Sequence, residues 1–275
     1  MFNWTTGLCS SIAILILLFI LSTLWTKGLS HLDIQFITKP SYGSGLEGGI
    51  LYQIVGTCIL LLVTCIIVLP CATSFAVFYT SLLPPGRFKN FLRPLLHILN
   101  ATPSILFGII GYLFFVKICA WNKSWLAGSF TLALMILPTV TISLIHRIQS
   151  IPKSYVEGAL GLGFNEETML RAVILPYSWG GLWTGVVMGL ARAAGETAPI
   201  MFTAVVFSGA SIPDGVVNNP VLALPYHIFN LTQDMFGEKA MAAAWASSFI
   251  LVVCVFIISA FAIPMRIKSH EEAKK

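Results

Sequence analysis

The chain has 275 residues, of which 57% are hydrophobic and only 10% are charged, and its formal net charge is +5. Soluble domains carry about 25% charged residues, so this composition excludes an ordinary soluble protein. The positive charge is not gathered in a long basic run, and we therefore expect no nucleic-acid binding. The six cysteines lie in or beside apolar segments without metal-ligand spacing. We expect neither a metal site nor a cofactor.

Long uncharged segments predict an all-α protein that crosses a lipid membrane several times. A bilayer core of about 30 Å needs about 20 consecutive apolar residues in a helix. The first apolar segment lacks the basic flank and the cleavage pattern of a signal peptide, and we interpret it as a retained span. We predict six transmembrane helices, at residues 8–26, 50–80, 103–120, 126–147, 178–207 and 240–265.

Lysine and arginine are divided unevenly between the two sets of connections. One side carries ten: Arg87, Lys89, Arg93, Arg147, Lys153, Arg171, Arg266, Lys268, Lys274 and Lys275. The other side carries five: Lys27, Lys39, Lys117, Lys123 and Lys239. The positive-inside rule places the richer side in the cytoplasm. Six spans then predict that both termini are cytoplasmic.

The cytoplasmic segment from Ser154 to Pro176 has the pattern of two short amphipathic helices joined by a tight turn. Gly163 suits a left-handed turn position, and Asn165 suits the N-cap of the second helix. We expect Pro176 to end this segment before the fifth span. The apolar face needs a cover, which either the chain itself or a partner protein supplies.

This segment resembles the EAA loop of binding-protein-dependent ABC transporter permeases. The matching residues are Glu157, Gly158 and Ala159, then Gly163, then Val173, Ile174, Leu175 and Pro176. Gly158 stands where the family pattern has its first alanine. The stretches PSILFGIIGYLFF and ARAAGETAPIMFTAVVF are similar to the PstA-type permeases of phosphate ABC transporters.

The resemblance implies a type I ABC importer permease fold and the import of inorganic phosphate across a bacterial inner membrane. It also implies three partners: a homologous second permease, a cytoplasmic ATPase dimer and a periplasmic phosphate-binding protein. The chain then divides into a first span with an external loop at 1–49, a permease core at 50–265 and a cytoplasmic tail at 266–275. The core contains the coupling loop at 150–176.

ATP hydrolysis is expected on another subunit, because the chain contains no G-x-x-x-x-G-K-[S/T] motif to hold a nucleotide. We predict no catalytic residues. The loop would instead dock on the ATPase; the alternative is a connector that packs on its own chain. The predicted coupling residues are Glu157, Gly158, Ala159, Gly163, Leu175 and Pro176.

Three glycines form a stripe along the fifth predicted span: Gly181, Gly185 and Gly189. They are spaced four apart, which lets another helix approach closely. On a regular helix Arg192 and Glu196 continue this stripe, so they face protein or a cavity rather than lipid.

Pro199 cannot donate a hydrogen bond to the carbonyl four residues before it, which predicts a kink beside the two charges. We predict that Arg192, Glu196, Thr197 and Pro199 line the translocation path or its gate, since a guanidinium binds phosphate through two parallel hydrogen bonds. Glu196 keeps Arg192 from trapping the anion, and it accepts a hydrogen bond from protonated phosphate that sulfate cannot offer. The alternative is a buried ion pair that fixes the contact with the partner permease.

The stretch NATPSILFG predicts a second candidate, an anion-facing helix start at Thr102, Pro103 and Ser104. Thr102 suits an N-cap and Pro103 a first helical residue, which leaves free N–H groups. The alternative is the ordinary start of a span.

Three other functions stay open. A permease of the same family could carry another oxyanion or small solute. A membrane-embedded enzyme needs clustered His, Asp or Glu near one membrane face, and the sequence offers none. A secondary transporter predicts a second broken helix in a repeat, and only one such break is found.

Overall fold

A computed structural model describes residues 2–42, 47–206, 209, 212–213, 215–233 and 237–272. Within these residues five helical stretches are long and apolar enough to cross a membrane: Trp4–Leu29, Leu51–Leu82, Trp125–Gln149, Glu166–Ala194 and Glu238–Ala260. Their main helices are α1 (Phe2–Leu29), α3 (Leu51–Val77), α6 (Trp125–Gln149), α9 (Leu175–Ala194) and α12 (Glu238–Glu272). The second stretch also includes the π-helical turn η1 (Phe78–Leu82), and the fourth begins with residues before α9. The predicted helical, multi-span architecture is confirmed.

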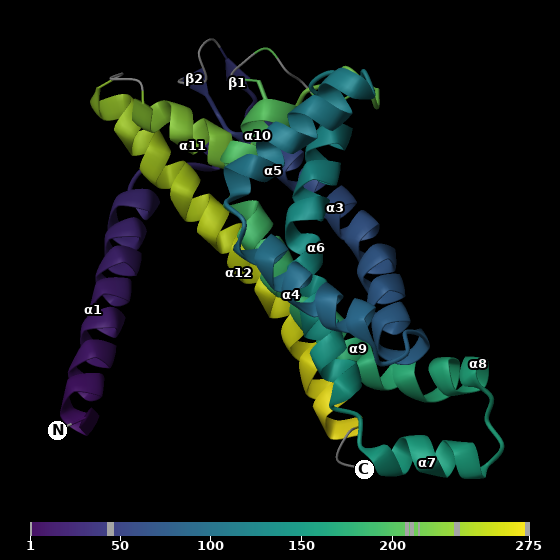
Figure 1. Ribbon diagram of the computed structural model, residues 1–275. Helices are drawn as coiled ribbons and strands as arrows, with labels where there is room; N and C mark the ends of the chain where they lie inside the picture. The colour runs from purple at the N-terminus through teal and green to yellow at the C-terminus, as the bar shows by residue number, and fades with distance from the viewer. Residues whose placement is uncertain are drawn as a thin grey trace.

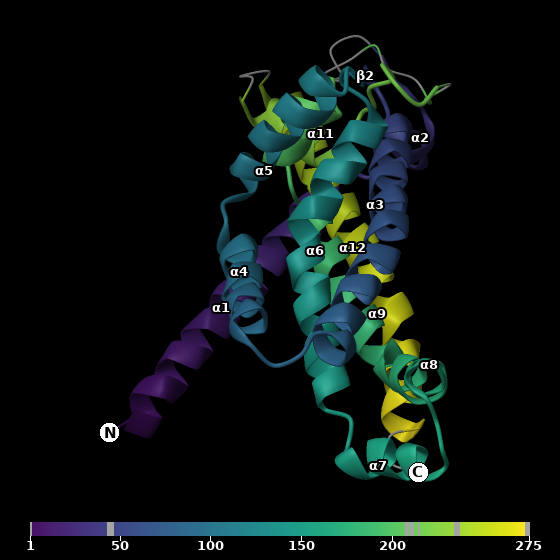
Figure 2. The same cartoon turned by 45° about the vertical axis from the view of Figure 1, so that its right-hand side comes forward.

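The third predicted span is built differently from the prediction. Residues 103–120 form α5 (Ser104–Gly111) and the π-helical turn η2 (Tyr112–Ile118). At about 1.5 Å per residue these rise only about 22 Å, which is short of a bilayer core. Residues expected in a loop instead form α4 (Arg87–Ala101), and α4 meets α5–η2 at a bend of 95°. Figure 2 shows α4 beside the body and α5 turned across its end.

The bend follows from Pro103. A residue before proline is driven out of the helical region, and Thr102 accordingly has φ −66° and ψ 134°. The cationic residues of α4 were expected to mark a loop. They lie on an amphipathic helix, and only together with α5–η2 does that helix reach the length and apolarity of a sixth span.

The molecule has two distinct ends (Figure 1). One end holds α5, α10 (Ala198–Thr203), α11 (Leu224–Gln233) and a short antiparallel hairpin of β1 (Ser41–Tyr42) and β2 (Glu47–Gly48). The hairpin follows α2 (Ile34–Thr38), and Ser41 pairs with Gly48. The other end holds α7 (Lys153–Gly161) and α8 (Glu166–Met169).

The start of α1 and the end of α12 lie at the same end of the molecule as α7 (Figure 1). The predicted tail at 266–275 is not a separate element as far as Glu272, because α12 continues through that residue. The last three residues, which include Lys274 and Lys275, lie outside the described part of the chain.

The packed body centres on α6, which lies between α3 and α9. Two thirds of its span are buried inside the protein, against 6% for α1. Helix α1 instead diverges from the body (Figure 1) and meets α12 near its own C-terminal end, where the rings of Trp25 and Phe249 lie 5.5 Å apart. The central helices therefore form one packed unit, and α1 is attached to its side.

The glycine stripe explains how closely α9 packs on α6. A methyl group at Gly185 would lie 2.8 Å from Ser143 Cβ, and one at Gly189 would lie 3.2 Å from Ile136 Cβ. At Gly181 it would overlap the Arg147 side chain. The neighbour that the glycines admit is thus a helix of the same chain.

Helix α9 is continuous with α8 through the π-helical turn η3 (Leu170–Ile174). Pro176 was expected to end the loop before the fifth span, but it lies in the first turn of α9. A proline removes one backbone hydrogen bond, and a local π turn is a common way to re-pair the freed groups. The loop and the span therefore form one continuous helical stretch.

Candidate functional site

The fifth span breaks beside its charged residues. Helix α9 ends at Ala194 and α10 begins at Ala198. The N–H groups of Gly195 and Glu196 turn back to the carbonyls of Arg192 and Ala193, at 3.1 and 3.2 Å, which tightens the last turn. The predicted disruption beside the charges is thus a break between two helices and not a kink within one, and Glu196 lies outside the helix that carries the glycine stripe.

Pro199 occupies the first turn of α10, where a missing N–H costs nothing. It is buried, and its Cα would lie 2.9 Å from a methyl group at Gly108. Thr197 is the cap residue of α10 and is half-buried, and its carbonyl accepts the N–H of Met201 at 3.0 Å. The start of α10 is therefore packed closely against α5 directly after the break.

Arg192 and Glu196 form an ion pair at the break. The distance from Arg192 Nε to Glu196 Oε1 is 3.4 Å, and the two side chains are 35% and 17% exposed. Strong charge-assisted pairs are shorter, about 2.7–2.9 Å. The contact uses one of the five N–H donors of the guanidinium. The arginine thus keeps most of its donors for other partners.

Two residues that the sequence analysis missed complete this cluster, namely Asn100 and Thr139. Arg192 Nη1 lies 3.5 Å from the Asn100 carbonyl, and Thr139 Oγ1 donates to Asn100 Oδ1 at 2.5 Å. Asn100 lies in the last turn of α4, and Thr139 lies within α6. The bend between α4 and α5 brings Asn100 to this position. The sequence pattern did not indicate it, because residues 81–100 were predicted to form a connection between spans.

The candidate helix start at Thr102 takes a different form from the prediction. Thr102 Oγ1 donates to the carbonyl of Ile98 at 2.9 Å, so it closes the end of α4 instead of capping α5. Pro103 is the cap residue, and α5 begins at Ser104 without a side-chain cap. The proposed roles of Thr102 and Pro103 as N-cap and first helical residue are therefore corrected.

The predicted helix–turn–helix loop lies at the opposite end of α9. Gly163 has φ +81°, and Asn165 Oδ1 accepts the N–H of Thr168 at 2.8 Å, so both local predictions are confirmed. Glu157, Gly158 and Gly163 are exposed, whereas Ala159 is buried. Leu175 is half-buried and Pro176 exposed at the start of α9.

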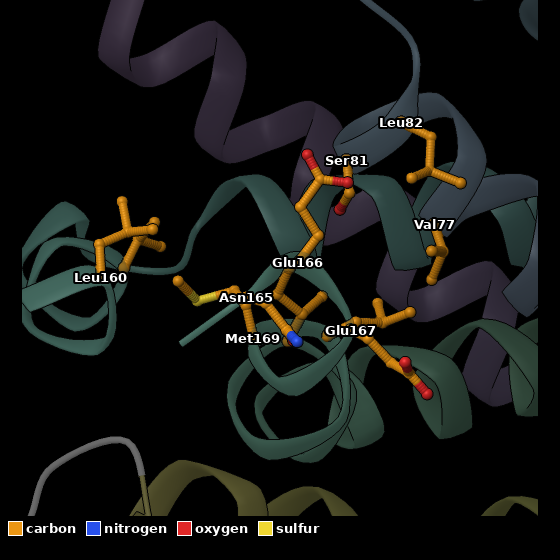
Figure 3. Close-up of a pocket in the computed structure, with 11 residues that line it drawn as sticks. Val77, Ser81, Leu82, Leu160, Asn165, Glu166, Glu167 and Met169 are labelled. Atoms are coloured by element: carbon orange, nitrogen blue, oxygen red, sulfur yellow. The ribbon is translucent and has the colours of Figure 1, made fainter. Parts of the chain in front are cut away.

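The loop leaves apolar surface uncovered. Leu160 and Leu162 are 58% and 78% exposed. A pocket of about 560 Å³ lies beside α7 and α8. Figure 3 shows Leu160 on one side of it and Val77 and Leu82 on the other. Its lining comprises Val77, Ser81, Leu82, Val156, Leu160, Asn165, Glu166, Glu167, Met169, Leu170 and Ile174.

A further contact that the sequence did not predict joins the loop to the transmembrane body. The rings of Tyr155 on α7 and Tyr177 on α9 lie 6.0 Å apart. The Arg147 guanidinium, from α6, lies 4.6 Å from the Tyr177 ring, and Arg147 Nε donates to the Tyr177 carbonyl at 3.2 Å. These three residues connect α7, α9 and α6.

Across the described ranges, no three His, Cys, Asp or Glu side chains are placed to hold a metal ion. Figure 1 shows the loop and the break at opposite ends of the helical body.

Comparison with known proteins places the chain among transporter permeases. The family of binding-protein-dependent transport system inner membrane components matches residues 69–267, which is more than half of the sequence. The chain belongs to this family. It is a multi-pass membrane permease subunit of an ABC transporter. The family that the EAA loop resembles is confirmed.

Individual relatives cover nearly the whole permease. It is 30% identical over 265 residues to the probable ABC transporter permease protein YqgI of Bacillus subtilis, which covers 92% of this chain and 90% of that protein. It is 29% identical over 252 residues to the phosphate transport system permease protein PstA of Pasteurella multocida, with 90% and 86% covered. It is 31% identical over 280 residues to the probable phosphate transport system permease protein PstA of Methanocaldococcus jannaschii, with 99% and 94% covered.

The fold is that of the ABC importer permeases. A chain of the MetNI methionine ABC transporter, in an inward-facing conformation, superposes with a TM-score of 0.62 at 14% identity. The superposition covers 80% of this permease and 97% of that chain.

Proposed function

We propose that this permease moves inorganic phosphate across the bacterial inner membrane and that Arg192 is the main anion ligand on the path. The observation that carries the proposal is the state of the guanidinium at the helix break. Arg192 is 35% exposed and is held by two long contacts, to Glu196 at 3.4 Å and to the Asn100 carbonyl at 3.5 Å. A guanidinium with unused donors is suited to a tetrahedral oxyanion.

Glu196 provides the acceptor in this arrangement. At neutral pH phosphate retains a proton that it can donate, whereas sulfate does not. A carboxylate beside the guanidinium therefore favours phosphate and also weakens the hold of Arg192 on the anion, which lets the anion leave. Thr197 and Pro199 hold the break open between α9 and α10, since neither continues the helix of Arg192.

We propose that the coupling loop docks on a cytoplasmic ATPase dimer, which hydrolyses the ATP. The exposed Leu160 and Leu162 support this, because apolar side chains on a polar loop need a partner. The name of the family supports a substrate-binding protein as a further partner, here a periplasmic phosphate-binding protein. A homologous second permease completes the path. In this assembly the α7 end and both termini face the cytoplasm.

Uptake of labelled phosphate by the complete transporter tests the proposal. Arg192→Gln should reduce uptake to background while the permease is present in the membrane at its normal level. The glutamine carries no charge and cannot donate two parallel hydrogen bonds as a guanidinium does. Arg192→Lys should retain a fraction of uptake. Arg87→Gln, at an exposed position at the start of α4, is the matched control and should transport normally.

Normal uptake by Arg192→Gln would overturn the proposal that Arg192 binds the anion on the translocation path. Loss of the partner permease from the purified Arg192→Gln complex would favour the alternative, an ion pair that fixes the interface. Equal uptake of phosphate and sulfate by the wild type, with saturating binding proteins for each, would favour the wider class of oxyanion permeases.

A further inference from the structure

Asn100 has one side-chain atom engaged and one available. Its Oδ1 accepts the hydroxyl of Thr139 at 2.5 Å. With Oδ1 accepting from the Thr139 hydroxyl, the Nδ2 group lies on the other side of the amide. Among the described residues Nδ2 has no hydrogen-bond partner, and it is not among the buried unpaired polar atoms. The amide of this half-buried residue thus keeps two N–H donors without a protein partner.

The backbone of Asn100 lies beside Arg192. The Asn100 carbonyl lies 3.5 Å from Arg192 Nη1. Asn100 is also in the last turn of α4, just before the 95° bend toward α5. Asn100 therefore contacts α9 through its backbone, while its side chain is held by α6 through Thr139.

We propose that Asn100 is a second anion ligand on the path, donating from Nδ2 to an oxygen of the phosphate that Arg192 binds. Thr139 is its positioning residue. The inference rests on the proposed function, since it needs an anion at Arg192. A tetrahedral oxyanion has more oxygens than one guanidinium can pair. A neutral amide supplies a further hydrogen bond without a second positive charge, which would slow release.

Two substitutions of similar size separate a ligand from a structural residue, namely Asn100→Asp and Asn100→Leu. The aspartate keeps an acceptor for Thr139 but replaces the donors with a negative charge. The leucine removes both functions without adding charge. A ligand role therefore makes the aspartate variant the slower of the two, whereas a purely structural role makes the leucine variant the slower.

The measurement is phosphate uptake into proteoliposomes that hold the complete transporter, with ATP supplied on the ATPase side and saturating binding protein. Loss of a hydrogen bond to a charged group slows a step that depends on it about tenfold. We expect at least that fall in maximal uptake for Asn100→Asp. Asn100→Leu should fall less, and Thr139→Val least. The half-saturating phosphate concentration should not change, because the binding protein captures the substrate.

Uptake by Asn100→Asp at or above that of Asn100→Leu would overturn the inference. Arg192→Gln, measured in parallel, distinguishes failure of the proposed function from failure of the role of Asn100. Normal uptake by Arg192→Gln would overturn the proposed function itself. Lost uptake by Arg192→Gln with normal uptake by Asn100→Asp removes only the role of Asn100. If neither Asn100 variant reaches the membrane, Asn100→Ser should exceed Asn100→Ala, because serine retains a donor, and equal uptake by these two overturns the inference.

Discussion

Helix α9 ends in two regions that expose opposite kinds of groups. At the loop end, apolar side chains such as Leu162 are exposed, and aromatic and cationic groups tie α7 to the body. At the break, polar groups from α4, α6 and α9 meet at half-buried positions, and both contacts of Arg192 are long. Between them, glycines hold α9 tightly on α6.

The difference separates two tasks within one permease. An exposed apolar surface is suited to a permanent protein partner, because its burial is favourable and non-directional. Partly satisfied polar groups are suited to a small anion that must bind and leave. A rigid helix between the two regions would transmit a movement of the loop to the break. The following predictions test that division, beginning with the largest expected effect.

The glycine contact between α9 and α6 should tolerate no larger residue. Gly185→Leu should remove folded permease from the membrane, because even a methyl group there would lie 2.8 Å from Ser143 Cβ and 3.1 Å from the Val140 backbone. Membrane levels by immunoblot measure this effect. Gly158→Ala is the control, since nothing lies within 4 Å of an added methyl group there. Normal levels of Gly185→Leu would show that the two helices can separate.

The loop should lose its partner when its apolar surface is made polar. Leu162→Ser, at a side chain that is 78% exposed, should lower the recovery of the ATPase with the purified permease by about tenfold, since burial of a leucine contributes about 1.5–3 kcal/mol. The permease itself should remain stable. We expect Leu162→Ser to leave phosphate binding at the break unchanged. Full recovery of the ATPase would assign the docking surface elsewhere.

The link between the loop and the body should be needed for coupling but not for assembly. Tyr177→Leu removes the ring between Tyr155 and Arg147. We expect an ATPase that remains bound and active, with several-fold less phosphate moved per ATP hydrolysed. Trp179→Leu, at an exposed neighbouring position, serves as the control and should keep the ratio. An unchanged ratio in Tyr177→Leu would remove these rings from the coupling route.

The smallest effect concerns pH and the end of the molecule that holds α11. Burial lowers the pKa of His227 from 6.5 to about 4. Between pH 4 and pH 6.5, approximately, the unfolded chain therefore binds a proton at this histidine that the folded chain does not bind. The stabilisation is present above about pH 6.5, and it falls as the pH falls toward about 4. Thermal unfolding in detergent at pH 7 and pH 5 should show a smaller difference in His227→Gln than in the wild type; an equal difference would exclude His227 as the cause.

Residue pattern alone was sufficient for the features that depend on local chemistry. Segment length and apolarity determine the five long spans of the described residues, because a bilayer admits few other structures. Gly163 and Asn165 determine the turn and cap of the loop, since each acts through its own backbone neighbourhood. The spacing of the EAA loop, together with its glycine and proline, identified the family.

Tertiary structure decided what lies between elements that are far apart in the chain. Periodicity could not show that α4 would form one half of a bent sixth span, because cationic residues on one helical face look the same as those in a loop. It could not place Asn100 and Thr139 beside Arg192, since that contact depends on the 95° bend and on the packing of α6. It also placed Glu196 on the helix, whereas the chain uses Pro199 to start a new one. The sequence thus named the charged pair, and only packing across three helices supplied its surroundings.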